Sequence, residues 1–301
     1  MNVDIPARFA RSVEARPADA LSPAGTPSGS DWIAALPRLV GSVLDDWQLA
    51  PDGHSRTGRC ALVVPVRTAD DRPAMLKLTW PHLEARGEHI ALRHWDGRGA
   101  VQLLRADPHR LALLLERLDP SDLTGVWVDE ACEVIGGLLA ELVAPAIARI
   151  PTLSAYAARQ AAAPAPAALP PRFADQARHL AADLATDPGV DAQLLHTDLH
   201  FANVLAGGRV PWLAIDPKPM AGDRAFEVAP VLWNRADELG SGSAVRWSLR
   251  RRVEVVCDAA GIDEAKARAW AVVRVVDWAR DLAPGCDDAG LAVSILKAVN
   301  D

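Results

Sequence analysis

The sequence predicts an α+β chain in which a small antiparallel sheet is followed by a mainly helical half. Apolar residues between positions 60 and 115 recur in short runs with the two-residue period of strands, and beyond Val128 they recur with helical spacing. An apolar run at 111–115 then passes directly into the linker 116–120. We therefore expect the two halves to join near Leu118.

The first residues carry little periodic signal. Residues 1–30 are rich in Pro, Gly and small polar residues and are expected to be weakly ordered. Three apolar residues with helical spacing either dock on the body or form a frayed turn: Ile5, Phe9 and Val13. A helix is predicted over 32–46, with Ser30 or Asp31 as its cap.

Short strands are predicted to follow this helix. Their expected positions are 47–49, 60–66, 74–79, 101–104 and 111–115. The loop 54–58, which contains Ser55, joins the first two strands. It either folds over nucleotide phosphates with its backbone amides or is an ordinary hairpin loop.

Lys77 is unusual because lysine is scarce in this chain and this one lies in an apolar strand. A buried ammonium group needs an anionic partner. The helix predicted from Pro81 to about Trp95 carries Glu84 and Glu88 one turn apart, and either can pair with Lys77. Glu88 is preferred because it lies nearer the middle of that helix. Protein kinases use such a lysine–glutamate pair to hold the α- and β-phosphates of ATP.

The linker after the last strand is typical of a hinge between two lobes. Its backbone carbonyl and amide groups near Glu116 and Leu118 are candidates for binding an adenine edge. The predicted organisation is a weakly ordered segment at 1–30, an N-terminal nucleotide-binding lobe at 31–118 and a C-terminal catalytic lobe at 119–301.

The C-terminal half is predicted to be helical around one irregular stretch. Helices are expected at 128–142, 173–185, 245–259, 263–283 and 289–299, with a Pro/Ala loop at 164–171. Asp277, Trp278 and Asp281 lie on or near one face of the fourth helix. They are either ligands for a cationic substrate or a solvated acidic face beside a core tryptophan.

The irregular stretch contains an H-x-D-x-x-x-x-N motif from His196 to Asn203, then a glycine turn and a short apolar strand that ends at Asp216. Asp198 can accept a proton from a hydroxyl group. Asn203 and Asp216 offer the oxygen ligands that suit Mg²⁺ between phosphates. One tight turn and one strand bring both ligands to the same end of a hairpin. Protein kinases carry these three groups in this order.

Two further groups follow Asp216. Lys218 either reaches phosphate or substrate, or points outward. Asp223 and Glu227 are predicted to brace the structure, by accepting backbone hydrogen bonds from the loop or by pairing with Arg224.

Composition excludes several classes of protein. The chain has 301 residues, is half hydrophobic and carries a net charge of −7, which argues against a nucleic-acid partner and weakly favours a cationic substrate. Neither a signal peptide nor an apolar run of membrane-spanning length is evident. The four scattered cysteines indicate reduced thiols in a cytoplasmic protein: Cys60, Cys132, Cys257 and Cys286.

The stretches 195–205 and 211–219, with Gly222 and Asp223 after them, resemble the streptomycin 6-phosphotransferase and hydroxyurea kinase family of the aminoglycoside phosphotransferases. Segments around Lys77, 95–101 and 114–118 are also similar to that family, so the likeness covers nearly the whole chain from Trp32. Glu227 departs from it, standing where an Asp is usual.

The resemblance implies a two-lobed, protein-kinase-like fold with ATP and Mg²⁺. It assigns the catalytic base to Asp198, the metal ligands to Asn203 and Asp216, and the phosphate lysine to Lys77. The expected activity is phosphorylation of a hydroxyl group on an antibiotic such as streptomycin, by a monomer or homodimer without membrane contact. Alternatives are another antibiotic, hydroxyurea or a metabolite as acceptor, or a regulator that binds nucleotide without catalysis.

Overall fold

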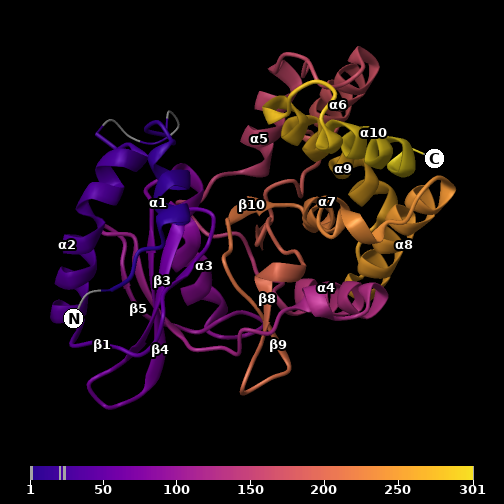
Figure 1. Cartoon of the computed structure of the whole chain (residues 1–301). Helices are drawn as coiled ribbons and strands as arrows, with labels where there is room; N and C mark the ends of the chain where they lie inside the picture. Colours follow the sequence, from indigo (N-terminus) through magenta and orange to yellow (C-terminus); the bar gives the residue numbers. More distant parts are fainter. Residues whose placement is uncertain (1–2, 20–21, 23–24, 301) are drawn as a thin grey trace. The chain divides into compact units, whose positions relative to one another are not determined.

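The computed structural model describes residues 3–19, 22 and 25–300, and the chain divides into two compact units between Leu118 and Asp119. The N-lobe comprises the described residues up to Leu118, and the C-lobe comprises those from Asp119 (Figure 1). The sheet lies in the N-lobe and most of the helices in the C-lobe, so the predicted α+β, protein-kinase-like class is confirmed.

The N-lobe is built on an antiparallel sheet with the strand order β1-β3-β4-β6-β5, in which β2 also pairs with β3. Its strands are β1 (Ala50–Pro51), β2 (Arg56–Thr57), β3 (Ala61–Arg67), β4 (Pro73–Thr79), β5 (Leu103–Asp107) and β6 (Ala112–Glu116). The strand that carries Lys77 is therefore central, because β4 pairs with β3 on one side and with β6 on the other.

Alternation along β4 separates two faces of this sheet. Ala74, Leu76 and Leu78 belong to the core that the sheet shares with α1 (Ala7–Glu14) and α2 (Gly29–Trp47). Lys77 and Thr79, two residues further on, point to the other face, where α3 (Glu88–Trp95) lies (Figure 1). The pleat of the strand thus directs the buried ammonium group of Lys77 to the face covered by α3.

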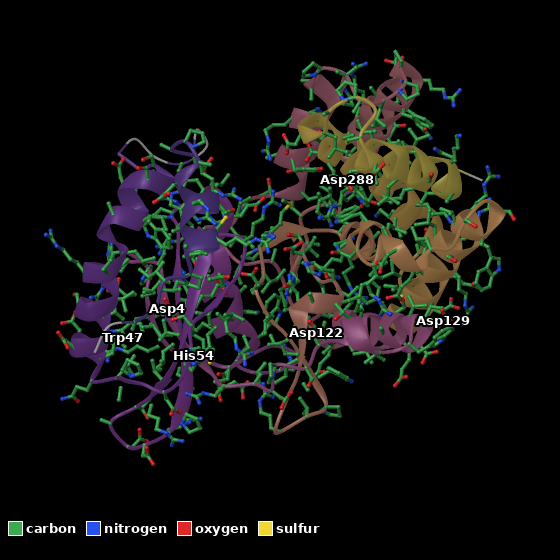
Figure 2. The ribbon with its side chains drawn as sticks, in the orientation of Figure 1. Asp4, Trp47, His54, Asp122, Asp129 and Asp288 are labelled. Carbon is green, nitrogen blue, oxygen red and sulfur yellow. The ribbon has the colours of Figure 1, made fainter. Side chains whose placement is uncertain are left out.

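Three local predictions for the N-lobe differ from the structure. Within 1–30, the segment Ala7–Glu14 is a helix whose Phe9 and Val13 are buried, so this apolar face docks on the lobe. The cap of α2 is Ser28, whose hydroxyl accepts the Asp31 N–H at 3.1 Å. Trp47, labelled in Figure 2, ends α2 and does not begin a strand.

The helix predicted from Pro81 begins later than expected. A 3₁₀ turn, η1 (Leu83–Gly87), precedes α3, so Glu88 lies at the first position of the α-helix and not near its middle. An acidic residue in the first turn of a helix is favoured by the helix dipole.

The C-lobe consists mainly of helices around a few very short strands. Its α-helices are α4 (Val128–Glu141), α5 (Leu153–Ala162), α6 (Pro171–Leu184), α7 (Pro230–Trp233), α8 (Ser243–Ala260), α9 (Glu264–Trp278) and α10 (Asp287–Val299). The 3₁₀ turns are η2 (Leu123–Gly125), η3 (Phe201–Asn203), η4 (Arg224–Val228), η5 (Ala236–Glu238) and η6 (Ala279–Asp281). Helix α5 was not predicted. In the described ranges, no helix is long and apolar enough to cross a membrane.

Two small ladders hold the irregular stretch of the C-lobe. Strand β7 (Gln193–Leu195) pairs with β10 (Met220–Gly222), and β8 (Val204–Ala206) pairs with β9 (Trp212–Ala214). The H-x-D motif therefore follows the last residue of β7, and Asn203 directly precedes β8.

Candidate active site

The β8–β9 hairpin brings Asn203 and Asp216 to one end, as the spacing predicts. Val204 is paired with Ala214, and the Ile215 N–H donates to the Asn203 carbonyl at 2.9 Å. Asp216 follows with φ +58°, a left-handed conformation that non-glycine residues seldom adopt. The ladder thus fixes the backbone from which both candidate metal ligands project.

Asp198 lies beside the same ligand. The Asn203 Nδ2 group donates to the Asp198 carbonyl at 2.9 Å and approaches its Oδ2 at 3.4 Å. Because Nδ2 is directed at Asp198, the side-chain atom that Asn203 can offer to a cation is Oδ1. One side chain therefore ties the candidate base to the candidate metal site.

Lys218, whose direction the sequence left open, contacts Asp198. Its Nζ forms an ion pair with Asp198 Oδ2, and both side chains are partly exposed. Its backbone is fixed as well, since its N–H donates to the His196 carbonyl at 2.9 Å and its carbonyl accepts the Thr197 hydroxyl at 2.6 Å. Lys218 is thus directed at the candidate base.

His196 is a buried neutral imidazole. Burial lowers the pKa of His196 to about 4. Its Nε2 lies 3.0 Å from the Ile215 carbonyl, and its Nδ1 lies 3.3 Å from the Asp198 backbone nitrogen. Nε2 therefore donates and Nδ1 accepts, so the ring links the loop to the strand before Asp216.

Glu227 accepts backbone hydrogen bonds from the loop, which is one of the two roles that the sequence predicts for it. Its Oε1 accepts the backbone N–H of His196 and, at 3.0 Å, that of Thr197. Burial raises the pKa of Glu227 to about 7, although these two hydrogen bonds oppose the shift. The longer glutamate side chain still reaches the loop where a shorter Asp is usual.

Asp223 does not touch the loop. It caps η4 by accepting the Ala225 N–H at 2.9 Å, and it contacts the Lys266 ammonium group. Arg224 instead donates to the carbonyls of Leu139 and Ala260, at 3.3 and 2.8 Å. Asp223 and Arg224 therefore hold neighbouring helices in place.

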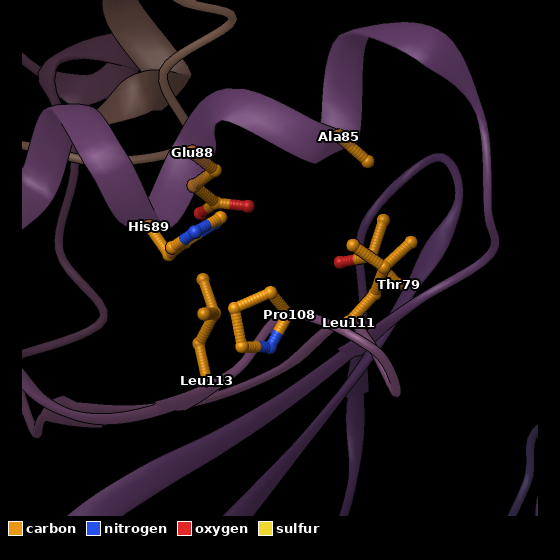
Figure 3. Close-up of a pocket in the computed structure, with 7 residues that line it drawn as sticks. All are labelled: Thr79, Ala85, Glu88, His89, Pro108, Leu111 and Leu113. Atoms are coloured by element: carbon orange, nitrogen blue, oxygen red, sulfur yellow. The ribbon is translucent and has the colours of Figure 1, made fainter. Parts of the chain in front are cut away.

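In the N-lobe, Lys77 pairs with Glu88, the preferred partner. The Nζ–Oε1 distance is 2.6 Å, and both residues are buried. Figure 3 shows Glu88 and His89 lining a small pocket with Thr79 and four hydrophobic residues: Ala85, Pro108, Leu111 and Leu113. Glu84 is exposed on η1. The lobe therefore presents one fixed lysine on the α3 face of its sheet.

The other candidate nucleotide residues lie on two separate segments of the N-lobe, before β2 and at the end of β6. Ser55 is partly buried between β1 and β2, next to His54, which Figure 2 labels. The Glu116 carboxylate accepts the Gln102 N–H at 2.8 Å, and the Glu116 N–H donates to the Gln102 carbonyl at 3.0 Å. Among the described residues, no backbone hydrogen bond uses the N–H of Leu118.

The three candidate substrate residues of the C-terminal helices differ from one another. Asp277 is partly buried, accepts the Tyr156 hydroxyl at 3.0 Å and pairs with Arg280 at 2.8 Å. Trp278 stacks on Trp233, with the ring centroids 5.8 Å apart. Asp281 is exposed. Asp277 is thus already engaged within the lobe.

One residue that contacts the loop was missed. Arg274 on α9 donates from Nη2 to the Thr197 carbonyl at 2.8 Å and from Nη1 to the Phe226 carbonyl at 3.1 Å. Arginine is abundant in this chain, and its partners are far away in sequence, so no local pattern distinguishes it.

Sequence comparisons find a family and several relatives that match most of the chain. A model of the family described as aminoglycoside/hydroxyurea antibiotic resistance kinase matches residues 46–282. A streptomycin 6-kinase of Streptomyces glaucescens is 41% identical over 257 residues, which cover 82% of this chain and 83% of that protein. A hydroxyurea phosphotransferase of Kitasatospora aureofaciens is 42% identical over 268 residues, covering 84% and 74%.

Solved structures give the same fold at low identity. Aminoglycoside phosphotransferase APH(4)-Ia matches with a TM-score of 0.57 and 14% identity, covering 87% of this chain and 98% of that one. The choline kinase LicA from Streptococcus pneumoniae matches with a TM-score of 0.56 and 13% identity, covering 88% and 99%. The extent of the family match and the identities of the two kinases show that the chain belongs to the aminoglycoside/hydroxyurea antibiotic resistance kinases.

Proposed function

We propose that this kinase transfers the γ-phosphate of ATP to a hydroxyl group of a streptomycin-like aminoglycoside, and so inactivates the antibiotic. The observation that carries the chemistry is the hairpin that brings Asn203 and Asp216 to one end, with the Asn203 side chain donating to the Asp198 carbonyl. The acceptor class rests on the streptomycin 6-kinases of Streptomyces glaucescens and Streptomyces griseus, which are 41% and 37% identical to this chain.

The donor set at the hairpin fits Mg²⁺. Asn203 Oδ1 and the Asp216 carboxylate are hard oxygen ligands, which Mg²⁺ prefers. In the described part of the chain, no three His, Cys, Asp or Glu side chains form a metal site. Such a two-ligand site suits an ion that takes its remaining ligands from phosphates and water. When bound, Mg²⁺ would neutralise charge on the β- and γ-phosphates.

Asp198 is the proposed general base. It orients the acceptor hydroxyl and takes its proton as the oxygen attacks the γ-phosphorus, while the bond to ADP breaks. Lys218, which contacts its carboxylate, keeps positive charge beside the position of the transferring group. Positioning and electrostatics carry most of such catalysis.

The N-lobe residues are proposed to bind the nucleotide. Lys77, held by Glu88, would contact the α- and β-phosphates. The Glu116 carbonyl and the Leu118 amide would bind the adenine edge, and backbone amides around Ser55 would cover the phosphates. The hydrogen bonds of Glu116 to Gln102 support this by fixing the hinge side of β6.

The acceptor is proposed to bind near Lys218 and the end of α9. Among the candidates at the end of α9 and on η6, Trp278 and Asp281 suit direct contact better than Asp277, whose oxygens already bind Tyr156 and Arg280. A reaction that consumes ATP fits a cytoplasmic enzyme with free thiols, acting as a monomer or homodimer on a small molecule.

A screen for phosphate transfer tests this proposal. Purified protein, ATP and Mg²⁺ are incubated with streptomycin, other aminoglycosides, peptide and nucleoside antibiotics and hydroxyurea, and mass spectrometry detects the addition of one phosphate. Streptomycin is expected to gain it. Transfer to hydroxyurea alone would support the second candidate, which the 42% identical hydroxyurea phosphotransferase favours. If no acceptor gains phosphate and none raises ADP production, the regulator that binds nucleotide without catalysis would be favoured.

A further inference from the structure

The peptide unit between Thr197 and Asp198 is held on both of its polar edges. Its carbonyl accepts Arg274 Nη2 at 2.8 Å, and its N–H donates to His196 Nδ1 at 3.3 Å. Because a peptide unit is planar, fixing both edges fixes the direction in which the chain enters Asp198. Arg274 supplies one of these two restraints.

Thr197 needs such restraint because its backbone is strained. Its φ is +61°, in the left-handed region that a β-branched residue rarely adopts. The Thr197 N–H donates to Glu227 at 3.0 Å, and its hydroxyl donates to the Lys218 carbonyl at 2.6 Å. Every polar group of Thr197 is therefore engaged, and a strained residue of this kind persists only where its surroundings determine it.

Arg274 is itself fixed by aromatic rings. Its guanidinium carbon lies 4.4 Å from the centroid of Phe226 and 5.3 Å from that of Trp233. Trp233 in turn stacks on Trp278, which is one helical turn beyond Arg274 on α9. Helix α9, which carries the candidate substrate residues Asp277 and Trp278, thus also carries the residue that holds the catalytic loop.

We propose that Arg274 is the positioning residue of the catalytic base, linking the acceptor-bearing helix α9 to the carbonyl that precedes Asp198. This inference rests on the proposed function, because it concerns the reaction that Asp198 performs. Arg274 does not touch the reacting atoms; it acts through the Thr197 peptide.

The geometry requires a guanidinium group and not merely a positive charge. Within the described residues, the hydrogen-bond acceptors of Arg274 are two carbonyls, those of Thr197 and Phe226. A planar fork can donate to both while it stacks on the rings, whereas an ammonium group is a compact point charge. Lysine at this position keeps the charge and loses the fork.

The test compares Arg274→Lys with Arg224→Lys. Arg224 is a matched control, since it also donates to two carbonyls, of Leu139 and Ala260, outside the loop. Arg274→Lys is expected to lower kcat about 10²-fold with the KM for ATP unchanged. Arg224→Lys is expected to lower the melting temperature similarly and to retain kcat within about twofold.

Amide hydrogen exchange gives a readout that does not depend on activity. Residues 195–200 are expected to exchange faster in Arg274→Lys than in wild type, and at the wild-type rate in Arg224→Lys. Should Arg274→Lys not fold, Trp233→Leu replaces it, because that change keeps both hydrogen bonds of Arg274 and removes one ring. A threefold to tenfold loss of kcat is then expected, roughly the value of one cation–π contact.

Equal kcat values for Arg274→Lys and Arg224→Lys would overturn the inference, as would a change in the KM for ATP alone. Unchanged exchange over 195–200 in Arg274→Lys would also overturn it. If the wild-type protein phosphorylates no acceptor, the proposed function fails, and the exchange measurement still decides whether Arg274 holds the loop.

Discussion

Each lobe contains a lysine–carboxylate pair, and the two pairs differ in their exposure to water. In the N-lobe, the side chains of Lys77 and Glu88 are 8% and 4% exposed. In the C-lobe, those of Lys218 and Asp198 are 32% and 21% exposed. Separating Lys77 from Glu88, the buried pair, leaves an uncompensated charge. Solvent screens Lys218 and Asp198, the half-exposed pair. The first pair suits a fixed phosphate ligand, and the second can release its carboxylate to a hydroxyl group.

The largest effect on kcat is expected when the half-exposed pair loses its carboxylate. Asp198→Asn should lower kcat by about 10² to 10⁴, the usual loss for a general base, with a small change in stability. Steady-state kinetics with the acceptor found in the screen measures it. Asp129→Asn is the control, because Asp129, labelled in Figure 2, forms a similarly exposed pair with Arg251 away from the loop. Near-normal turnover by Asp198→Asn would contradict the assignment.

Breaking the buried pair should affect stability instead. Lys77→Met leaves the Glu88 carboxylate buried without its cation and is expected to cost about 3–5 kcal/mol of unfolding free energy. The double variant Lys77→Met/Glu88→Leu should recover much of that loss. Urea denaturation of the three proteins measures both values. Equal stabilities for the single variant and the wild type would show that this pair is not buried in solution.

Glu227, which holds the loop that carries Asp198, should make the unfolding free energy depend on pH. The folded-state pKa of Glu227 is raised from its ordinary 4.5 to about 7, so between these values the native state binds more protons than the unfolded state. The contribution of Glu227 therefore falls as pH rises from 4.5 to 7, by about 3 kcal/mol in total. Glu227→Gln keeps an acceptor oxygen for the loop and should remove this slope.

His196 changes stability with pH in the opposite direction, and it is present in both the wild type and Glu227→Gln. Its folded-state pKa is lowered to about 4, so its contribution is present above its ordinary 6.5 and is lost as pH falls toward 4. The difference between wild type and Glu227→Gln, measured by urea denaturation at several pH values, isolates Glu227. A pH-independent difference would contradict the buried, proton-binding brace.

The smallest effect on stability is expected from the cation of the half-exposed pair. Lys218→Met should change the unfolding free energy by about 0–1 kcal/mol, because solvent screens the pair. That difference should shrink further in about 1 M salt, where the Debye length is short. A loss as large as that of Lys77→Met would mean that the two pairs do not differ in the way their exposure indicates.

Features set by local sequence were predictable. The turn and strand between Asn203 and Asp216 form one hairpin, so their common end follows from spacing alone. The strand of Lys77 was recognisable by its apolar neighbours. Lys77 pairs with Glu88, as the sequence predicts. The predicted position of Glu88 in the middle of its helix is wrong, because Glu88 is the first residue of α3.

Features set by distant partners were not predictable. The direction of Lys218 depends on its contacts with His196, Thr197 and Asp198 in an earlier segment, which spacing does not reveal. Arg274 gains its role from carbonyls of two other segments. Helix α5 was missed because its alanine-rich sequence lies beside a Pro/Ala stretch that reads as loop, and the helix is defined by a cap at Thr152 and by its buried face.

The β8–β9 hairpin also indicates where this chain can change in length. Its tip, around the exposed Gly208 and Arg209, lies at the end opposite Asn203 and Asp216. Extra residues at the tip would lengthen the loop and leave the ladder in register. A single residue inserted within β9 would shift its pairing register, reverse the faces of the strand residues after it, and displace Asp216. The tip is therefore a suitable place for an epitope or a fluorophore.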